Sequence, residues 1–281
     1  MHYALISFLN ARPLWWGLVH GKPREGETRE FTSPARCADL IADGTASLGL
    51  VPAIEIVRIP GVVAVPDLCI ASRSEVRSVL LVSRVEIDAI RSVALDPNSR
   101  TSIALARILL GERLGQDRYD EIRFDPVEAQ RLLTLEGHDA AVVIGDRALQ
   151  VSAEPESRAD LNVYDLVSEW SRMYGDPFVF ALWAGRRDRL ADAKGVRERL
   201  IESYRFGIEH LDRIASEASA ELGVPRAEIN EYFESALHYE FEAPERRGLE
   251  RFNRLAAKYG LIPEPKEVEW LEATSEASKK S

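Results

Sequence analysis

Four polar segments of the chain combine hydroxyl, amide and guanidinium groups of the kind that bind a small acid. The first, residues 7–12, follows the apolar run 3–6 and contains Ser7, Asn10 and Arg12. Such a run is typical of a buried strand, and in open α/β sheets ligands bind beyond the carboxyl ends of the strands. The three side chains suit a carboxylate or hydroxyl ligand. A loop with an asparagine turn and a surface arginine would contain the same residues, so this segment alone leaves both interpretations open.

The second segment, residues 98–102, lies between an expected strand and an expected helix and contains Ser99, Thr101 and Ser102. One hydroxyl is enough to cap a helix, and this segment has more hydroxyl and amide groups than one cap requires. A helix N-terminus binds anions through free N–H groups, and each favourable charge contact contributes roughly 0.3 to 1 kcal/mol. Because the glycines and lysine of a phosphate-binding P-loop are missing, we expect a carboxylate here.

The other two segments contribute single residues. Asp146 follows Gly145 at the end of an apolar strand, where it is a helix N-cap by default and could instead bind a ligand hydroxyl. Ser78 lies where the chain is expected to leave its first lobe, and a small donor there could meet a ligand.

Glu55 is a helix-face carboxylate by default and a cleft acid only by position. The motifs of serine hydrolases, HExxH metalloenzymes and dinucleotide-binding enzymes do not occur.

The composition excludes several classes of protein. With 281 residues, 46% of them hydrophobic and 29% charged, the chain can bury a large core. The net charge of −10 argues against a nucleic-acid partner. No apolar run reaches the roughly 18 residues of a membrane helix, and the N-terminus lacks a signal-peptide pattern, so we expect a cytoplasmic protein with no membrane partner. Cys37, Cys69 and five scattered histidines predict neither a disulfide framework nor a metal site.

The hydrophobic pattern predicts the elements that must position the polar segments. Strands are expected over residues 3–6, 47–51, 77–83, 92–95, 139–144 and 178–183, and helices over 35–43, 53–58 and 101–110. Residues 188–261 have helical spacing, and these helices should cover the first lobe.

This order predicts an α/β, two-lobed, periplasmic-binding-protein-like (type II) fold, with two interlobe crossings and a ligand cleft between the lobes. Lobe 1 comprises residues 1–78 and 181–270, and lobe 2 is the inserted segment 79–180. Residues 271–281 form a small polar tail that we expect to be disordered. One continuous doubly wound sheet is the simpler alternative, because hydrophobic periodicity does not assign strands to sheets.

Seven short motifs occur in order along the chain. They are Ser7–Asn10, Gly49–Glu55, Arg77–Leu81, Ser99–Ser102, Ile144–Asp146, Asp165–Trp170 and Pro177–Trp183. The ordered set resembles the chorismate dehydratase family of the futalosine route to menaquinone. The resemblance extends nearly end to end and includes the C-terminal segment 232–261. A sister family that makes 1,4-dihydroxy-6-naphthoate typically has a cysteine- and proline-containing opening and a His-His pair, and this chain has neither.

The resemblance implies a carbon–oxygen lyase that converts chorismate into 3-[(1-carboxyvinyl)oxy]benzoate and water, without a cofactor or a metal. The C3 proton and the C4 hydroxyl of the ring would leave. We expect Asn10 and Ser78 to act near the reacting carbons as hydrogen-bond donors. The residues expected to bind the substrate are Ser7, Arg12, Ser99, Thr101, Ser102 and Asp146.

The sequence contains no obvious general base for this reaction. One hypothesis is that the enolpyruvyl carboxylate of the substrate removes the C3 proton, and the competing hypothesis assigns that role to Glu55 or Asp146. Two other functions stay open: a non-catalytic protein of the same fold that binds a small carboxylate, and the sister naphthoate synthase activity. The sequence also leaves the oligomeric state open.

Overall fold

The structure is a computed structural model that describes residues 1–154, 160–190 and 193–271. Its strands are β1 (His2–Ile6), β2 (Thr28–Thr32), β3 (Leu48–Pro52), β4 (Val62–Ser72), β5 (Val79–Ser83), β6 (Ser92–Leu95), β7 (Arg123–Pro126), β8 (Ala140–Ile144), β9 (Asn162–Asp165), β10 (Phe178–Arg186) and β11 (His238–Glu240). Its α-helices are α1 (Arg12–His20), α2 (Pro34–Ala42), α3 (Ala53–Arg58), α4 (Arg100–Leu114), α5 (Gln116–Asp120), α6 (Gly145–Ala153), α7 (Leu166–Tyr174), α8 (Ala193–Glu209), α9 (Leu211–Leu222), α10 (Arg226–Glu231) and α11 (Ala243–Lys258). Short turns of other helix types are η1 (Leu9–Ala11), η2 (Ile87–Ala89), η3 (Ala129–Thr134), η5 (Arg187–Arg189) and the π-helix η6 (Tyr232–Ala236).

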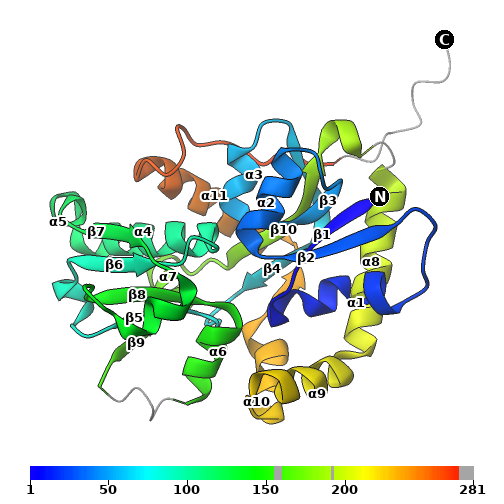
Figure 1. The fold of residues 1–281 in the computed structure, drawn as a ribbon. Helices are drawn as coiled ribbons and strands as arrows, with labels where there is room; N and C mark the ends of the chain where they lie inside the picture. Colours follow the sequence, from blue (N-terminus) through cyan, green and yellow to red (C-terminus); the bar gives the residue numbers. More distant parts are fainter. Residues whose placement is uncertain (155–159, 191–192, 272–281) are drawn as a thin grey trace.

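Two β-sheets form the framework, and the chain passes between them twice (Figure 1). The larger sheet has six strands in the order β11-β4-β10-β3-β1-β2, and the smaller has five in the order β7-β6-β8-β5-β9. The chain leaves the larger sheet after β4, forms the smaller one from β5 to β9, and returns with β10. The predicted two-lobed fold is therefore confirmed, and the alternative of one continuous sheet is wrong.

Several predicted elements occur with the expected signals at their ends. The helix 53–58 and the strand 92–95 have the predicted bounds. At the start of α2 the Ser33 hydroxyl accepts a hydrogen bond from the N–H of Arg36, and Pro34 is the first helical residue. Gly44 lies beyond the end of α2 with φ of 77°, a conformation that favours glycine.

Five strands were not predicted: β2, β4, β7, β9 and β11. Strand β4 contains Pro66 and Asp67, two residues that normally interrupt strands, and Asp67 adopts φ of 81°. The pairing of β4 with β10 shifts register along its length, so the strand continues past this irregularity. Strand β11 contradicts the expectation of helix throughout residues 188–261. Its three residues follow η6 and precede α11 in the chain, and they pair with the edge of β4. Local spacing does not reveal such an edge pairing.

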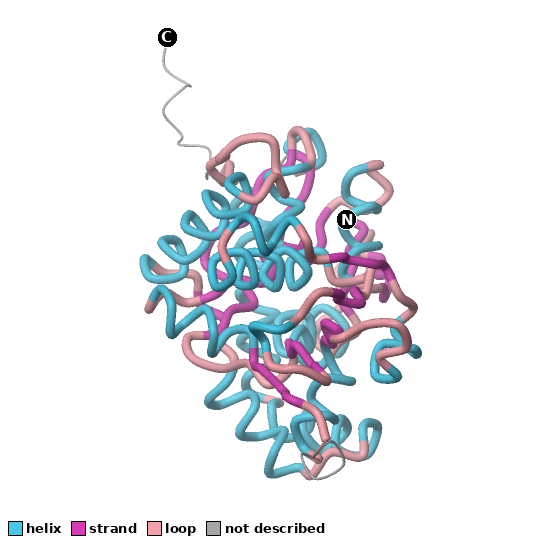
Figure 2. The backbone as a smooth tube through the Cα atoms, turned by 90° about the vertical axis from the view of Figure 1, so that its left-hand side faces the viewer, coloured by secondary structure: helices cyan, strands magenta, loops and turns pink. Residues whose placement is uncertain are grey.

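Helices cover the strands of both sheets (Figure 2). Segments from opposite ends of the sequence meet where α1 packs on α8. Two glycines allow this close approach. A Cβ atom on Gly207 would lie 2.0 Å from the carbonyl oxygen of Pro13, and one on Gly17 would lie 2.5 Å from Cα of Ser203. Since α1 continues from η1, this contact helps to fix the loop that follows β1.

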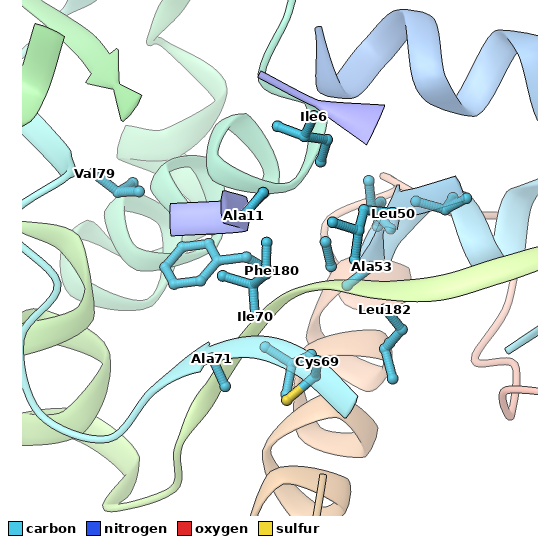
Figure 3. Close-up of a cluster of buried hydrophobic side chains, with 14 of the residues drawn as sticks. Ile6, Ala11, Leu50, Ala53, Cys69, Ile70, Ala71, Val79, Phe180 and Leu182 are labelled. Carbon is cyan, nitrogen blue, oxygen red and sulfur yellow. The ribbon is translucent and has the colours of Figure 1, made fainter. Parts of the chain in front are cut away.

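The core of the larger sheet is built from apolar side chains of four strands (Figure 3). Ile6, Leu50, Ile70 and Leu182 come from β1, β3, β4 and β10, and each is at most 3% exposed. In Figure 3, Ile70 and Phe180 lie next to each other, at the side of this core that faces the smaller sheet.

The sequence-based expectations about the C-terminal tail and membrane segments are only partly covered by the structure. Leu271 is buried, and its N–H donates to the carbonyl oxygen of Ala64 at 2.8 Å. The rest of the predicted tail 271–281 lies outside the described residues. Among the described residues, no helix is both long and apolar enough to cross a bilayer.

Cys37 and Cys69 are buried free thiols, and burial raises the pKa of Cys37 to about 12.

We predict that Gly207→Ala destabilises the fold. The added methyl group must push α8 away from the backbone of Pro13, and overpacking of this kind costs typically about 1–3 kcal/mol. Urea unfolding measures the change, and Arg205→Ala, an exposed substitution on the same helix, should shift the free energy of unfolding by less than about 0.5 kcal/mol. A Gly207→Ala protein as stable as the parent would show that the close approach of α1 and α8 is not a constraint.

Candidate active site between the lobes

A cavity lies between the two sheets. Small-molecule sites are mostly apolar with a few placed polar groups, and the lining of this cavity has that character. The elements of the larger sheet contribute Ile6, Phe8, Asn10, Pro34, Pro52, Ile70, Phe180 and Ala181, and those of the smaller sheet contribute Ser78, Val79, Ser99, Arg100, Thr101, Ser102, Ile144 and Gly145. Both lobes therefore supply walls, and the polar groups come mainly from three short segments.

Asn10 reaches the cavity from η1, the turn that directly follows β1. Its side-chain oxygen is buried and has no hydrogen-bond partner among the described residues. An unsatisfied buried acceptor costs about 1–3 kcal/mol, so a ligand that donates a hydrogen bond would offset this cost. The backbone of Asn10 is held by Tyr239, whose hydroxyl donates to the Asn10 carbonyl oxygen at 2.9 Å.

Ser78 reaches the cavity from the first interlobe crossing, immediately before β5. It is 1% exposed. Its N–H donates to the carbonyl oxygen of Val76 at 2.7 Å, and its own carbonyl oxygen accepts from the N–H of Gly145 at 2.8 Å. The hydroxyl accepts a hydrogen bond from Tyr232 at 2.7 Å. Backbone and side chain are thus fixed by separate partners.

The first turn of α4 forms the third polar segment of the cavity. Ser99, Thr101 and Ser102 all line it, and all three are buried. Within the described part of the chain, the Ser99 side chain makes no cap hydrogen bond to this helix. The Thr101 hydroxyl accepts from the N–H of Ile54 at 3.4 Å. Because the first N–H groups of an α-helix have no partner inside the helix, this turn can bind an anion.

Arg100 is the one ionisable side chain that lines the cavity among the residues that the structure describes. Its guanidinium donates to Glu55 at 3.1 Å and to Asp39 at 2.7 Å. Glu55 is buried and also accepts from Arg58 at 2.7 Å. The Glu55 carboxylate is therefore bonded to two arginines, and it is not part of the cavity wall.

Asp146 lies next to the cavity but does not line it. It belongs to the first turn of α6, whose N-cap is Ile144, so the interpretation of Asp146 as an N-cap is wrong. The carboxylate accepts from the N–H of Leu9 at 2.9 Å. Asp146 lines a neighbouring pocket together with Phe8. Burial raises the pKa of the Asp146 carboxyl. In this position Asp146 ties the smaller lobe to η1.

Ser7 and Arg12, the other two candidates from the first segment, also lie outside the cavity wall. Ser7 is exposed, and Arg12 is buried in an ion pair with Glu221 of α9. The chain turns through η1 after β1, so Asn10 lies on the cavity side while Arg12 begins α1. Five of the eight candidate residues are thus brought together: Asn10, Ser78, Ser99, Thr101 and Ser102.

Sequence reasoning missed the aromatic side chains around the site. Phe8 and Phe180 form apolar walls, and Tyr232 and Tyr239 bond to Ser78 and Asn10. Phe8 and Phe180 both lie within the motifs given in the sequence analysis. Only Phe180 falls in a predicted strand, and that pattern predicted its burial without predicting the surface that it contacts. No local signal points to the two tyrosines, because their partners are 154 and 229 residues away.

One group of potential metal ligands occurs among the described residues, outside the cavity. Atoms of His238, Glu242 and Glu245 lie within 4.8 Å of one another. Arg73 is within hydrogen-bond distance of all three, at 2.7, 3.4 and 2.9 Å respectively. A guanidinium therefore already supplies the positive charge that these groups require.

Two comparisons with known proteins concern the sequence. Residues 1–258 match the model of a family described as menaquinone biosynthesis. The chain is 29% identical over 261 residues to the chorismate dehydratase of Thermus thermophilus, a match that covers 88% of this chain and 92% of that protein.

Solved structures share the fold at lower sequence identity. A crystal structure of an Archaeoglobus fulgidus protein has a TM-score of 0.72 at 17% identity, and the match covers 93% of this chain and 98% of that one. The periplasmic aliphatic sulphonate binding protein of Escherichia coli has a TM-score of 0.65 at 13% identity, covering 100% and 96%. The fold is therefore that of periplasmic binding proteins. With a family match over nearly its whole length, the chain belongs to the menaquinone biosynthesis family that includes chorismate dehydratases.

Proposed function

We propose that this chain converts chorismate into 3-[(1-carboxyvinyl)oxy]benzoate and water, as a step of menaquinone biosynthesis. Its family and its similarity to the chorismate dehydratase of Thermus thermophilus support this activity. The observation that carries the proposal is the interlobe cavity, in which Asn10 and Ser78 share a largely apolar space with the first turn of α4.

The reaction removes the proton at ring carbon C3 and the hydroxyl at C4. The negative charge that develops at C3 is delocalised through the ring alkene into the ring carboxylate, and aromatisation favours the product. The protein must therefore hold two carboxylates, help the hydroxyl to leave and place a base beside C3.

In this proposal the first turn of α4 binds the ring carboxylate. Its free N–H groups and the hydroxyls of Ser99 and Ser102 suit a carboxylate, and the helix dipole favours negative charge at this end. Since the ring carboxylate gains electron density as the C3 proton leaves, these donors stabilise the transition state more than the bound substrate. A preorganised donor of this kind contributes on the order of 3 kcal/mol.

Ser78 and Asn10 act on the leaving hydroxyl. The Ser78 hydroxyl donates a hydrogen bond to the C4 oxygen as the carbon–oxygen bond breaks. The unpartnered amide oxygen of Asn10 accepts the proton of the C4 hydroxyl in the bound substrate and so fixes its orientation. Apolar walls such as Phe180 keep water away and strengthen both contacts.

The base is the enolpyruvyl carboxylate of the substrate itself. Among the described residues, no carboxylate, imidazole, thiol or amine lines the cavity. The two competing candidates are otherwise bonded, Glu55 to two arginines and Asp146 to the N–H of Leu9. Well-oriented intramolecular reactions gain roughly 7–11 kcal/mol, so a protein that fixes the substrate conformation needs no base of its own.

Incubation of the purified protein with chorismate tests this function. We expect new aromatic absorbance and a product that mass spectrometry and NMR identify as 3-[(1-carboxyvinyl)oxy]benzoate. Heat-denatured protein is the control for spontaneous decay. Chorismate that raises the Tm of the folded protein yet survives prolonged incubation would instead identify a binding protein without this activity.

Variants of the two proposed catalytic residues test the site. We predict that Ser78→Ala and Asn10→Ala each lower kcat by about 10²-fold, because each removes a preorganised hydrogen bond to the leaving hydroxyl. Far-UV circular dichroism checks that the variants remain folded.

Ser83, the last residue of β5, provides the matched control for Ser78, which directly precedes that strand. The Ser83 hydroxyl lies at the far end of β5, where it donates to the carbonyl oxygens of Val85 and Asp139. Ser83→Ala should lower stability and leave kcat within about twofold, as expected for a change remote from the site. Parental kcat values in both Ser78→Ala and Asn10→Ala would place the chemistry elsewhere.

A further inference from the structure

Tyr232 makes the one side-chain contact with the Ser78 hydroxyl among the described residues. It is the first residue of the π-helix η6, and it is 1% exposed. Its hydroxyl lies 2.7 Å from Ser78 Oγ, although 154 residues separate the two in sequence. Tyr232 is not among the residues that line the cavity.

The burial of Tyr232 decides which of the two hydroxyls donates. A buried O–H that finds no acceptor is costly, and Ser78 Oγ is the acceptor within reach of the phenol. Burial also raises the pKa of Tyr232, so the phenol keeps its proton near neutral pH. With one lone pair of Ser78 Oγ occupied by this proton, the serine proton is free to point into the cavity.

The backbone around this contact is held on both sides. Arg77, directly before Ser78, adopts φ of 59°, a strained conformation for a residue with a side chain. Its guanidinium donates to Glu231, directly before Tyr232, at 2.6 Å. Two consecutive residues of the interlobe crossing are thus paired with two consecutive residues of the C-terminal helical region.

A π-helical turn begins at Tyr232. The N–H of Leu237 donates to the carbonyl oxygen of Tyr232 at 3.2 Å, five residues back instead of four. The N–H of Tyr232 itself donates to Glu228, four residues back, so the extra residue of the wider turn lies after Tyr232.

We propose that Tyr232 is a positioning residue, which holds the Ser78 hydroxyl with its proton directed at the leaving C4 oxygen of chorismate. This inference rests on the proposed function, because it concerns the same cavity and the same reaction. Tyr232 touches neither substrate nor reacting atoms and acts through Ser78. The C-terminal helical region thereby contributes to a site whose walls come from other parts of the chain.

A double-mutant cycle in the full-length protein tests this role. Tyr232→Phe keeps the ring and its packing and removes only the hydroxyl. We expect kcat for chorismate to fall about tenfold, since a misdirected catalytic group loses much of its effect, while KM stays within about twofold. In the Ser78→Ala background the same substitution should change kcat by less than about twofold, because the group that it positions is gone.

Tyr259→Phe is the matched control. Tyr259 is also a buried tyrosine of the C-terminal region, and its hydroxyl donates to Glu112 at 2.7 Å, outside the cavity. It should lower Tm by an amount similar to Tyr232→Phe and leave kcat unchanged. An unchanged kcat in Tyr232→Phe, or an equal loss with and without Ser78, would overturn the inference while the parent remains active. A parent protein that forms no product from chorismate would overturn the proposed function and this inference together.

Discussion

The geometry of the site depends on the hydrogen bonds that hold the first interlobe crossing. Asp165, at the end of β9, accepts from the N–H groups of Val76 and Arg77 in that crossing, and also from the first turn of α7. The next residue, Ser78, is held at its backbone by Gly145 at the start of α6 and at its hydroxyl by Tyr232. The crossing is therefore fixed to the inserted lobe and to the C-terminal helices at once. Ser78 is therefore buried, and its hydrogen bond with Tyr232 fixes the direction of its hydroxyl.

The charges around the cavity follow from the same arrangement. The nearby carboxylates are used as structural acceptors: Asp165 for backbone N–H groups, Asp146 for the loop after β1, and Glu55 for two arginines. These contacts leave hydroxyls, an amide, a helix N-terminus and the guanidinium of Arg100 to face a ligand. Under the proposed function, such a site suits a dianion that carries its own base, because a further carboxylate beside it would repel both of the ligand's negative charges.

The sequence predicted the two-lobed fold, since runs such as 92–95 and 178–183 are apolar and bounded by turn residues. It missed β4, in which Pro66 and Asp67 interrupt the pattern, and β11, which exists only because an edge of β4 is free to pair. Three polar segments were correctly placed at strand ends, yet neighbours in one segment diverge: Asn10 lines the cavity and Arg12 pairs with Glu221. The direction of a side chain after a turn depends on packing partners that are distant in sequence. The contact of Tyr232 with Ser78 likewise joins residues 154 positions apart, so the sequence alone did not predict it.

A crystal structure of the protein with 3-[(1-carboxyvinyl)oxy]benzoate bound is the most direct test of this account. The account predicts the ring carboxylate against the first turn of α4, Ser78 and Asn10 on the C4 side of the ring, and the enolpyruvyl carboxylate folded towards C3 with no protein carboxylate nearer to that carbon. A ligand bound outside the interlobe cavity, or with Asp146 or Glu55 rotated to lie beside C3, would contradict it.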